Sequence, residues 1–175
     1  TPDGTFPQLA GQLAKVAIKQ LSDIRSLNRD NPTMYPFALP RSIGGPQSVA
    51  DVSAYIQQLP MNPDNGKGDW AAGTPEFTKG EKLYKDNCVQ CHGPTGQGNE
   101  EKYYPLILGQ HYKYMLRQFE WIRDGKRRNA NPDMVKQIVN FTDDDMKMVI
   151  NYVSRIPIPK DMVAPSVDWR NPDFE

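Results

Sequence analysis

The chain has 175 residues, a length that suits one domain or two small ones. It carries 21 basic and 21 acidic side chains, so its formal net charge is zero and no overall field directs it to nucleic acid or to an anionic membrane. No apolar run approaches the roughly 18 residues that a membrane-spanning helix needs. We therefore predict a protein that neither binds nucleic acid nor spans a membrane.

Residues 1–60 carry two helical stripes of apolar side chains, separated by a loop rich in proline and glycine. The first stripe runs into Arg25 and consists of Leu9, Leu13, Val16, Leu21 and Ile24. The second helix is expected to begin at Ser48, because Asp51 three residues later completes the pattern of a capping box. It is expected to stop at Pro60, and its stripe consists of Val49, Val52, Tyr55, Ile56 and Leu59.

The next stretch, residues 61–76, is rich in turn-forming residues and is predicted to be a linker. Trp70 lies within it, which indicates that the linker packs against the rest of the protein. A helix is expected to begin near Thr78 and to run to the cysteines. Gly80 lies inside this helix at a cost of roughly 1 kcal/mol relative to alanine, so we expect another helix to cross closely there.

Two more helices and a tail complete the chain. One helix carries Tyr114, Met115, Phe119 and Ile122. A loop that contains Met134 follows, and a last helix begins at Thr142 with three aspartates, which are favourable at the positive end of a helix dipole. Pro157 ends this helix. The proline-rich residues 158–175 are predicted to form an extended tail.

The only two cysteines of the chain belong to the motif Cys88-Val89-Gln90-Cys91-His92. The pattern Cys-x-x-Cys-His is typical of a c-type haem attachment site. Each thiol can add to one vinyl group of a haem, and the imidazole that follows can bind the iron. We therefore predict one covalently attached haem c.

Three other interpretations of the motif explain less. A thioredoxin-like redox pair would need a βαβ context, which the flanking sequence lacks. A structural zinc site usually takes four ligands from two such pairs, and the sequence has no second pair. A simple disulfide would leave the histidine as a coincidence.

The two halves of the sequence repeat each other. The pairs at offset 98 are Gly11-Gln12 with Gly109-Gln110, Gln20 with Gln118, and Arg25 with Arg123. Asn31-Pro32-x-Met34 matches Asn131-Pro132-x-Met134 at offset 100, and Tyr55 and Pro60 match Tyr152 and Pro157 at offset 97. The position 98 before Cys88 would precede the first residue. The first copy is therefore expected to lack a haem motif of its own.

Residues 76–157 resemble a class I c-type cytochrome. The resemblance rests on Gly80-x-x-x-Tyr84 before the cysteine motif, on Pro105, on Gly109-Gln110, on Met134 and on Tyr152. The whole chain resembles the tandem di-haem cytochromes c and the cytochrome subunit of flavocytochrome c. It departs from the di-haem pattern because the first Cys-x-x-Cys-His is absent.

This resemblance implies an all-α fold with two cytochrome c-like helical units in tandem. Residues 1–60 would form a truncated unit without haem, and residues 77–157 would form the haem-binding domain. Residues 61–76 would join the two units, and residues 158–175 would form the extended tail. We expect the tail to run back over the apolar stripes of the first unit, using Val163, Val167, Trp169 and Phe174.

By resemblance, Cys88 and Cys91 would form the thioethers, and His92 and Met134 would be the axial ligands of the iron. A methionine thioether raises the reduction potential relative to a second histidine. Pro105 would present its carbonyl group to His92. His111 is the rival ligand, although its place before a helix suggests a role at the surface or in packing.

A local basic cluster has two interpretations, and it consists of Lys113, Arg117, Arg123, Lys126, Arg127 and Arg128. It is either a solvated helix face or a docking patch with one arginine on a haem propionate, for which Arg127 is the candidate.

The leading hypothesis for function is an electron carrier and not an enzyme, because His/Met ligation leaves no open position on the iron. Covalent haem attachment follows export, so we expect a periplasmic protein whose signal peptide has been removed. One alternative is a haem subunit of a larger redox complex, such as a flavocytochrome-like dehydrogenase or an oxidase, whose partner docks on residues 1–60. Another is an open-site haem enzyme or gas-binding protein, if Met134 is not a ligand. Donor and acceptor proteins are the expected partners.

Overall fold

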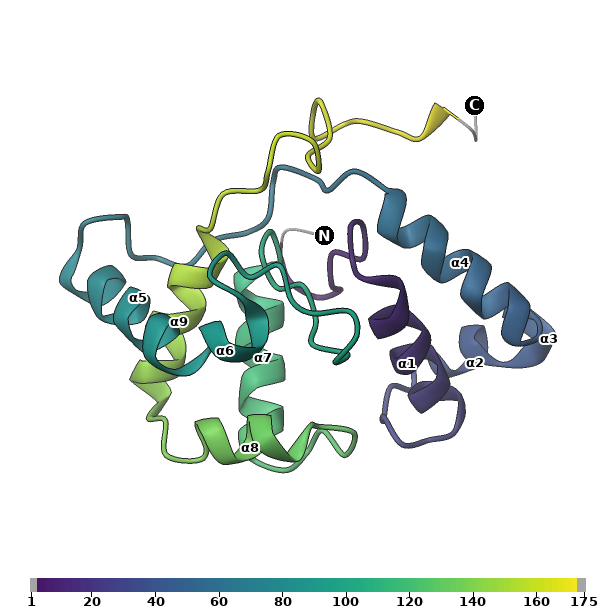
Figure 1. Cartoon of the computed structure of the whole chain (residues 1–175), viewed down its shortest axis with the longest axis horizontal. Coiled ribbons are helices and arrows are strands. Elements are labelled where there is room, and N and C mark those ends of the chain that lie inside the picture. Colours follow the sequence, from purple (N-terminus) through teal and green to yellow (C-terminus); the bar gives the residue numbers. More distant parts are fainter. Residues whose placement is uncertain (1–2, 173–175) are drawn as a thin grey trace.

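The computed structural model describes residues 3–172, and its regular structure in that range is helical (Figure 1). The helices are α1 (Ala14–Arg25), α2 (Tyr35–Ala38), α3 (Pro40–Ile43), α4 (Pro46–Gln58), α5 (Pro75–Asn87), α6 (Val89–His92), α7 (Tyr112–Arg123), α8 (Pro132–Ile138) and α9 (Asp143–Ser154). Within residues 3–172 the only β-type pairings are isolated bridges, so the predicted all-α class is confirmed.

The helices form two groups that follow the chain order. Figure 1 shows α1 to α4 on one side and α5 to α9 on the other. In the first group α1 packs against α4, and in the second α9 packs against both α5 and α7. The core of the second group includes Tyr84, Leu106, Leu108, Met115, Phe119, Ile138, Met146, Val149, Ile150, Val153 and Ile156.

Helices α5 and α9 cross at Gly80, as the sequence predicts. A Cβ atom at Gly80 would lie 2.1 Å from the carbonyl oxygen of Met148 and 3.3 Å from the Cβ of Tyr152. The ring of Tyr152 packs between Phe77 and Tyr84, with a centroid distance of 5.4 Å to each. Only glycine permits so close an approach of the two backbones.

Two helices begin earlier than the sequence suggests, each at a proline. Helix α4 starts at Pro46, so the capping box predicted at Ser48 is wrong, and the carboxylate of Asp51 accepts a hydrogen bond from Gln47 instead. Helix α5 starts at Pro75 rather than near Thr78. The physical reason is the same in both cases, because the fixed φ of proline suits the first helical position.

At the other end of the chain, the last helix has the start that its sequence predicts. The side chains of Thr142 and Asp145 cap it reciprocally. Met134, by contrast, was expected in a loop and lies in the short helix α8. Asn131 caps this helix by accepting the backbone N–H of Asp133.

The linker is bound along helix α9. The side chain of Asn65 donates to the carbonyl of Ser154 at 2.8 Å. The side chain of Asn151 accepts the backbone N–H of Trp70 at 3.1 Å and donates to its carbonyl at 2.9 Å. Because Asn65 and Trp70 are both bound to groups of one rigid helix, the linker is packed down, as the sequence predicts.

The two helix groups meet through contacts that follow the internal repeat. The side chain of Gln12 donates to the carbonyl of Leu106 at 2.9 Å and accepts its N–H at 3.1 Å. The side chain of Gln110 makes the same two contacts with the backbone of Gln8, at 2.9 and 2.7 Å. Both members of the second contact are related to those of the first by the offset of 98. The junction therefore has approximate two-fold symmetry.

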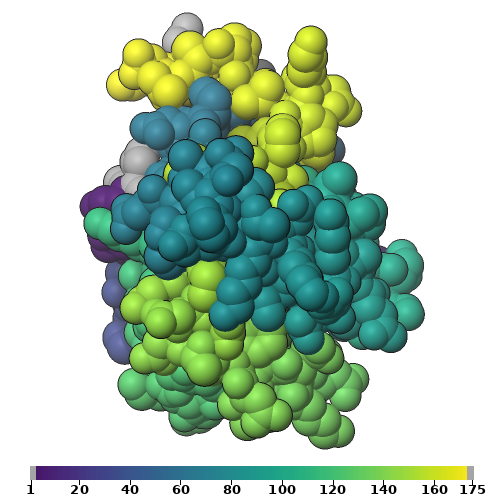
Figure 2. Space-filling model, turned by 90° about the vertical axis from the view of Figure 1, so that its left-hand side faces the viewer, coloured from purple at the N-terminus to yellow at the C-terminus, as the bar shows by residue number. Residues whose placement is uncertain are grey.

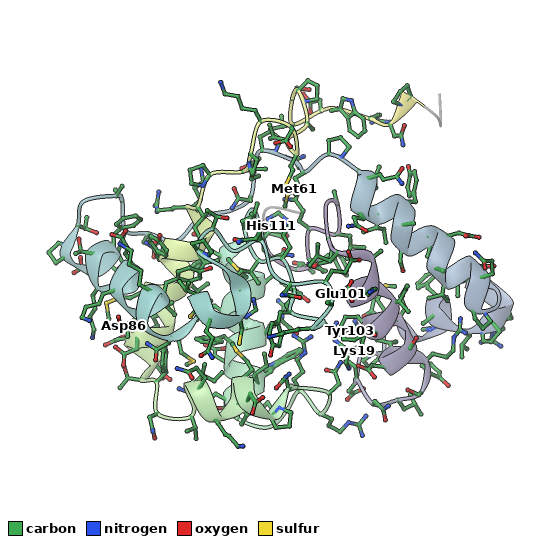
Figure 3. All side chains as sticks on the ribbon, in the orientation of Figure 1. Lys19, Met61, Asp86, Glu101, Tyr103 and His111 are labelled. Carbon is green, nitrogen blue, oxygen red and sulfur yellow. The ribbon has the colours of Figure 1, made fainter. Side chains whose placement is uncertain are left out.

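Met61 is buried at this junction (Figure 3). A Cβ atom at Gly11 would lie 2.8 Å from the Cγ of Met61, and one at Gly109 would lie 2.7 Å from its Cε. The two glycines are again 98 positions apart. One methionine thus fills the space that both repeats leave open.

The tail runs along the start of the linker and reaches α4 with one side chain. The N–H of Met61 donates to the carbonyl of Met162 at 2.7 Å, and the N–H of Ala164 donates to the carbonyl of Met61 at 2.8 Å. Asn171 donates to the hydroxyl of Tyr55 at 2.7 Å. Figure 2 shows the tail, in yellow, over the blue linker segment.

The expected cover of the first helix group is therefore found only in part. Val16 and Val49 are 4% and 5% exposed in helices that pack against each other, so they do not depend on the tail for burial. Val167 was expected to cover this face and is 52% exposed. Phe174 lies outside the described residues.

Deleting residues 161–175 should lower the melting temperature, because the deletion removes the two backbone hydrogen bonds between Met61 and the tail. An intramolecular hydrogen bond contributes about 0.5–1.5 kcal/mol net to stability. Differential scanning calorimetry measures the change, with Val167→Ala as the control at an exposed tail position. An unchanged melting temperature in the truncated chain would show that the tail contributes nothing to the fold.

Candidate haem site

The cysteine motif forms one tight turn at the end of α5. Cys88 is both the C-cap of α5 and the N-cap of α6. The N–H groups of Cys91 and His92 donate to the carbonyl of Cys88 at 3.2 and 2.9 Å. Both thiols are free and partly exposed. The turn therefore presents two thiols and an imidazole from a single segment.

His92 is buried and its ring is oriented by a backbone carbonyl. The Nδ1 atom lies 3.0 Å from the carbonyl oxygen of Pro105. With the proton on Nδ1, the ring donates to this carbonyl and keeps the lone pair of Nε2 for a metal. Burial lowers the pKa of His92, which favours the neutral imidazole that binds iron. A carbonyl partner of this kind also raises the basicity of the ligating nitrogen.

A glycine loop brings Pro105 to His92. The N–H of Gly98 donates to the carbonyl of His92 at 2.8 Å. Gly98 has φ +74°, and a Cβ atom there would lie 2.5 Å from the carbonyl oxygen of Tyr104. The chain can therefore fold back against the motif only because this residue lacks a side chain.

The acidity of the Cys88 thiol argues against a redox-active cysteine pair. Burial and the nearby Cys91 raise the pKa of Cys88 to about 12. Reactive Cys-x-x-Cys pairs have lowered thiol pKa values instead. A weakly acidic thiol at Cys88 beside the neutral imidazole of His92 suits a covalent haem site.

Helix α8 adjoins the motif and carries Met134. The side chain of Gln137 donates to Asn87, the residue before Cys88, at 2.8 Å. The pKa of Tyr104 is raised by Cys91 and, more weakly, by Asp133, so this phenol lies near both the motif and the start of α8. Met134 itself is partly buried and packs against the core of the second helix group.

The rival ligand His111 is buried as the N-cap of α7 and is 3% exposed. Its Nδ1 has no hydrogen-bond partner among the described residues. Burial lowers its pKa and keeps the ring neutral. Figure 3 places it near Met61, toward the junction of the two helix groups.

Arg127 lies at the junction and contacts amide side chains from both helix groups. Its guanidinium donates to Gln118 and to Gln20, each at 3.1 Å, and to Asn129 at 3.2 Å. Two neighbours in the predicted cluster also lie toward the junction: Lys126 lines the same cavity as Arg127, and Arg128 donates to the carbonyl of Leu27 at 2.8 Å. Other members of the cluster lie in different settings. Arg123, for example, forms ion pairs with two aspartates.

Sequence reasoning missed Arg29, which binds the same two glutamines as Arg127. It donates to Gln20 at 2.8 Å, to Gln118 at 3.3 Å and to the hydroxyl of Tyr114 at 3.2 Å. The offset of 98 that pairs the two glutamines also pairs the two arginines, and this signal could have identified Arg29.

Comparison with known proteins identifies the family of this chain. Residues 77–157 match the family model described as cytochrome c. A protein named thiosulfate dehydrogenase electron acceptor, from Stutzerimonas stutzeri, is 33% identical over 86% of this chain and 71% of its own length. Cytochrome c4 of Thiocapsa roseopersicina is 31% identical over 85% of this chain and 77% of its own length. The chain belongs to the cytochrome c family.

The fold agrees with this assignment. The crystal structure of reduced recombinant cytochrome c4 from Pseudomonas stutzeri superposes with a TM-score of 0.72 at 26% identity, covering 90% of this chain and 87% of that one. This protein is therefore a cytochrome c-type electron-transfer protein, and the family implies covalently bound haem c. No helix within residues 3–172 is long and apolar enough to cross a membrane.

Proposed function

We propose that this cytochrome carries one covalent haem c and transfers electrons between partner proteins in the periplasm. Cys88 and Cys91 hold the haem, and His92 and Met134 are its axial ligands. The bound haem supplies a one-electron couple. The contact between His92 Nδ1 and the carbonyl of Pro105 supports this proposal most strongly, because it leaves Nε2 as the only ring nitrogen for a ligand.

The proposed domain organisation assigns one role to each part of the chain. Residues 77–157 form the haem domain, residues 61–76 the linker and residues 158–175 the tail. Residues 1–60 form a cytochrome c-like unit without a haem motif, since the chain has no cysteine outside the motif. The repeated contacts of Gln12 and Gln110 support this tandem arrangement.

A haem count tests the proposal. The chain, expressed with export and haem maturation, should give one haem in a pyridine haemochrome assay and an intact mass with one haem added. Cys91→Ser should lose one of the two thioethers, which shifts the haemochrome band, whereas Met34→Ala should leave the count and the band unchanged. Two haems per chain, or none, would contradict the proposal.

A subunit role in a dehydrogenase complex is the second candidate. The relative named thiosulfate dehydrogenase electron acceptor favours it. Residues 1–60 also expose large apolar side chains, with Leu9 51% and Phe37 62% exposed, and such a surface suits a transient protein contact. Co-purification of the holoprotein with a dehydrogenase, abolished by Phe37→Ser, would favour this role over a free carrier.

A further inference from the structure

The junction of the two helix groups contains a pair of arginines that share neutral partners. Arg29 and Arg127 both donate to the side-chain oxygens of Gln20 and Gln118. Because two guanidinium groups converge on the same two oxygens, they lie close together across the junction. Amide oxygens accept hydrogen bonds but carry no charge that could neutralise the pair.

Carboxylates within residues 3–172 do not form an ion pair with either arginine. None of the ion pairs in that range involves Arg29 or Arg127. The nearby Asp23 binds Lys19 and accepts a hydrogen bond from Asn129 at 2.8 Å. Burial and the charge of Arg29 lower the pKa of Arg127 to about 10, because together they outweigh the opposing effect of the Asp23 carboxylate.

A cavity of about 250 Å³ opens beside the two arginines. Three cations line it, Arg29, Lys126 and Arg127, against the single carboxylate of Asp30. The ring of Trp121 also lines the cavity. The cavity therefore combines excess positive charge with the planar donors that bind carboxylate and phosphate groups in a bidentate manner.

We propose that Arg29 and Arg127 form one oxyanion site that joins the two halves of the chain. Its occupant is a carboxylate-type anion, either a propionate of the haem or a free oxyanion from solution. The haem version rests on the proposed function, and it is favoured because Arg127 lies in the loop that leads from α7 into α8, the helix that carries Met134. Arg29 is then a positioning residue that the half without a haem motif supplies to the haem of the other half.

The site has a consequence for the redox chemistry. A cation near the haem favours the reduced state, because the oxidised haem carries one more positive charge and is repelled more strongly. Removing the cation should therefore favour the oxidised state and lower the midpoint potential. An arginine that binds a propionate should also alter the vibrations of that propionate. A purely structural residue would leave the midpoint potential and the propionate vibrations unchanged.

The test uses the haem-loaded full chain and the variants Arg29→Gln, Arg127→Gln and Arg29→Lys. Arg41→Gln is the matched control, because it removes the same charge from an exposed position of the first helix group. The midpoint potential, the propionate bending mode in the resonance Raman spectrum and calorimetric titration with inorganic phosphate are measured for each. Arg29→Lys keeps the charge without the planar donors and serves if Arg29→Gln does not fold.

If a propionate occupies the site, both glutamine variants weaken the preference of the haem for the reduced state at least threefold. Both variants also shift the frequency of the propionate bending mode. The Arg41→Gln control changes neither the potential nor this mode. A tenfold change in that preference corresponds to 59 mV. If a free anion occupies it, the parent binds one phosphate and Arg29→Gln weakens this binding at least tenfold. The absence of both patterns overturns the oxyanion site. Failure to attach haem would overturn the proposed function instead, and the phosphate titration would still test the site.

Discussion

Met134→Ala should remove the sulfur–iron bond and open one axial position of the haem. The ferric protein should lose its sulfur–iron charge-transfer absorption at the red end of the spectrum, and the ferrous protein should bind carbon monoxide rapidly. The midpoint potential should fall by at least about 59 mV, a tenfold change for a one-electron couple, because the thioether favours the reduced iron. Optical spectroscopy and potentiometric titration measure these changes.

Met34→Ala is the matched control for this ligand. Met34 is the repeat counterpart of Met134, but it is the N-cap of α2 in the first helix group. Residues 1–60 contain no cysteine to which a haem could be attached. Loss of the Met34 side chain should leave the spectrum and the potential unchanged. An equal change in both variants would contradict the assignment, and loss of the absorption band in His111→Phe alone would transfer the role to His111.

Gly80→Ala should destabilise the haem domain by about 3 kcal/mol or more. The added Cβ would lie 2.1 Å from the carbonyl oxygen of Met148, and backbone atoms cannot move aside as a side chain can. Helices α5 and α9 must separate, which also weakens the packing of Tyr152 between Phe77 and Tyr84. Overpacking a filled core commonly costs about 1–3 kcal/mol, and a backbone clash belongs at or above the upper end of that range.

Chemical denaturation measures this change as the free energy of unfolding. For a domain of about 80 residues the corresponding fall in melting temperature is roughly 12–24 °C. Thr78→Ala tests the same helix at an exposed position, and it should change the free energy of unfolding by less than about 1 kcal/mol. A Gly80→Ala variant as stable as Thr78→Ala would show that the helices can separate at little cost.

Local sequence patterns were sufficient for the elements that depend on short-range physics. The motif from Cys88 to His92 predicts its chemistry because five consecutive residues define the spacing of thiols and imidazole. The start of α9 follows from Thr142 and Asp145, whose side chains cap the same turn. The glycine at position 80 predicts a close crossing because its helix-propensity cost needs a compensating contact.

The same local reasoning failed where two signals competed. Ser48 and Asp51 form a plausible capping box, but Pro46 starts the helix two residues earlier. Met134 follows a loop by composition, yet Asn131 caps a short helix that includes it. In both cases a proline at the first helical position decided the boundary.

The sequence by itself determined the helical class, the haem motif and the repeat, because each is encoded in residues that are close together or separated by a constant offset. Only the tertiary structure decided that Arg29 and Arg127 share two glutamines, that Met61 fills the junction between Gly11 and Gly109, and that the tail pairs with the linker. The contacts that cross between the helix groups or join the tail to the linker connect residues about 50 to 110 positions apart. Their geometry depends on how two helix groups pack, which no local pattern specifies.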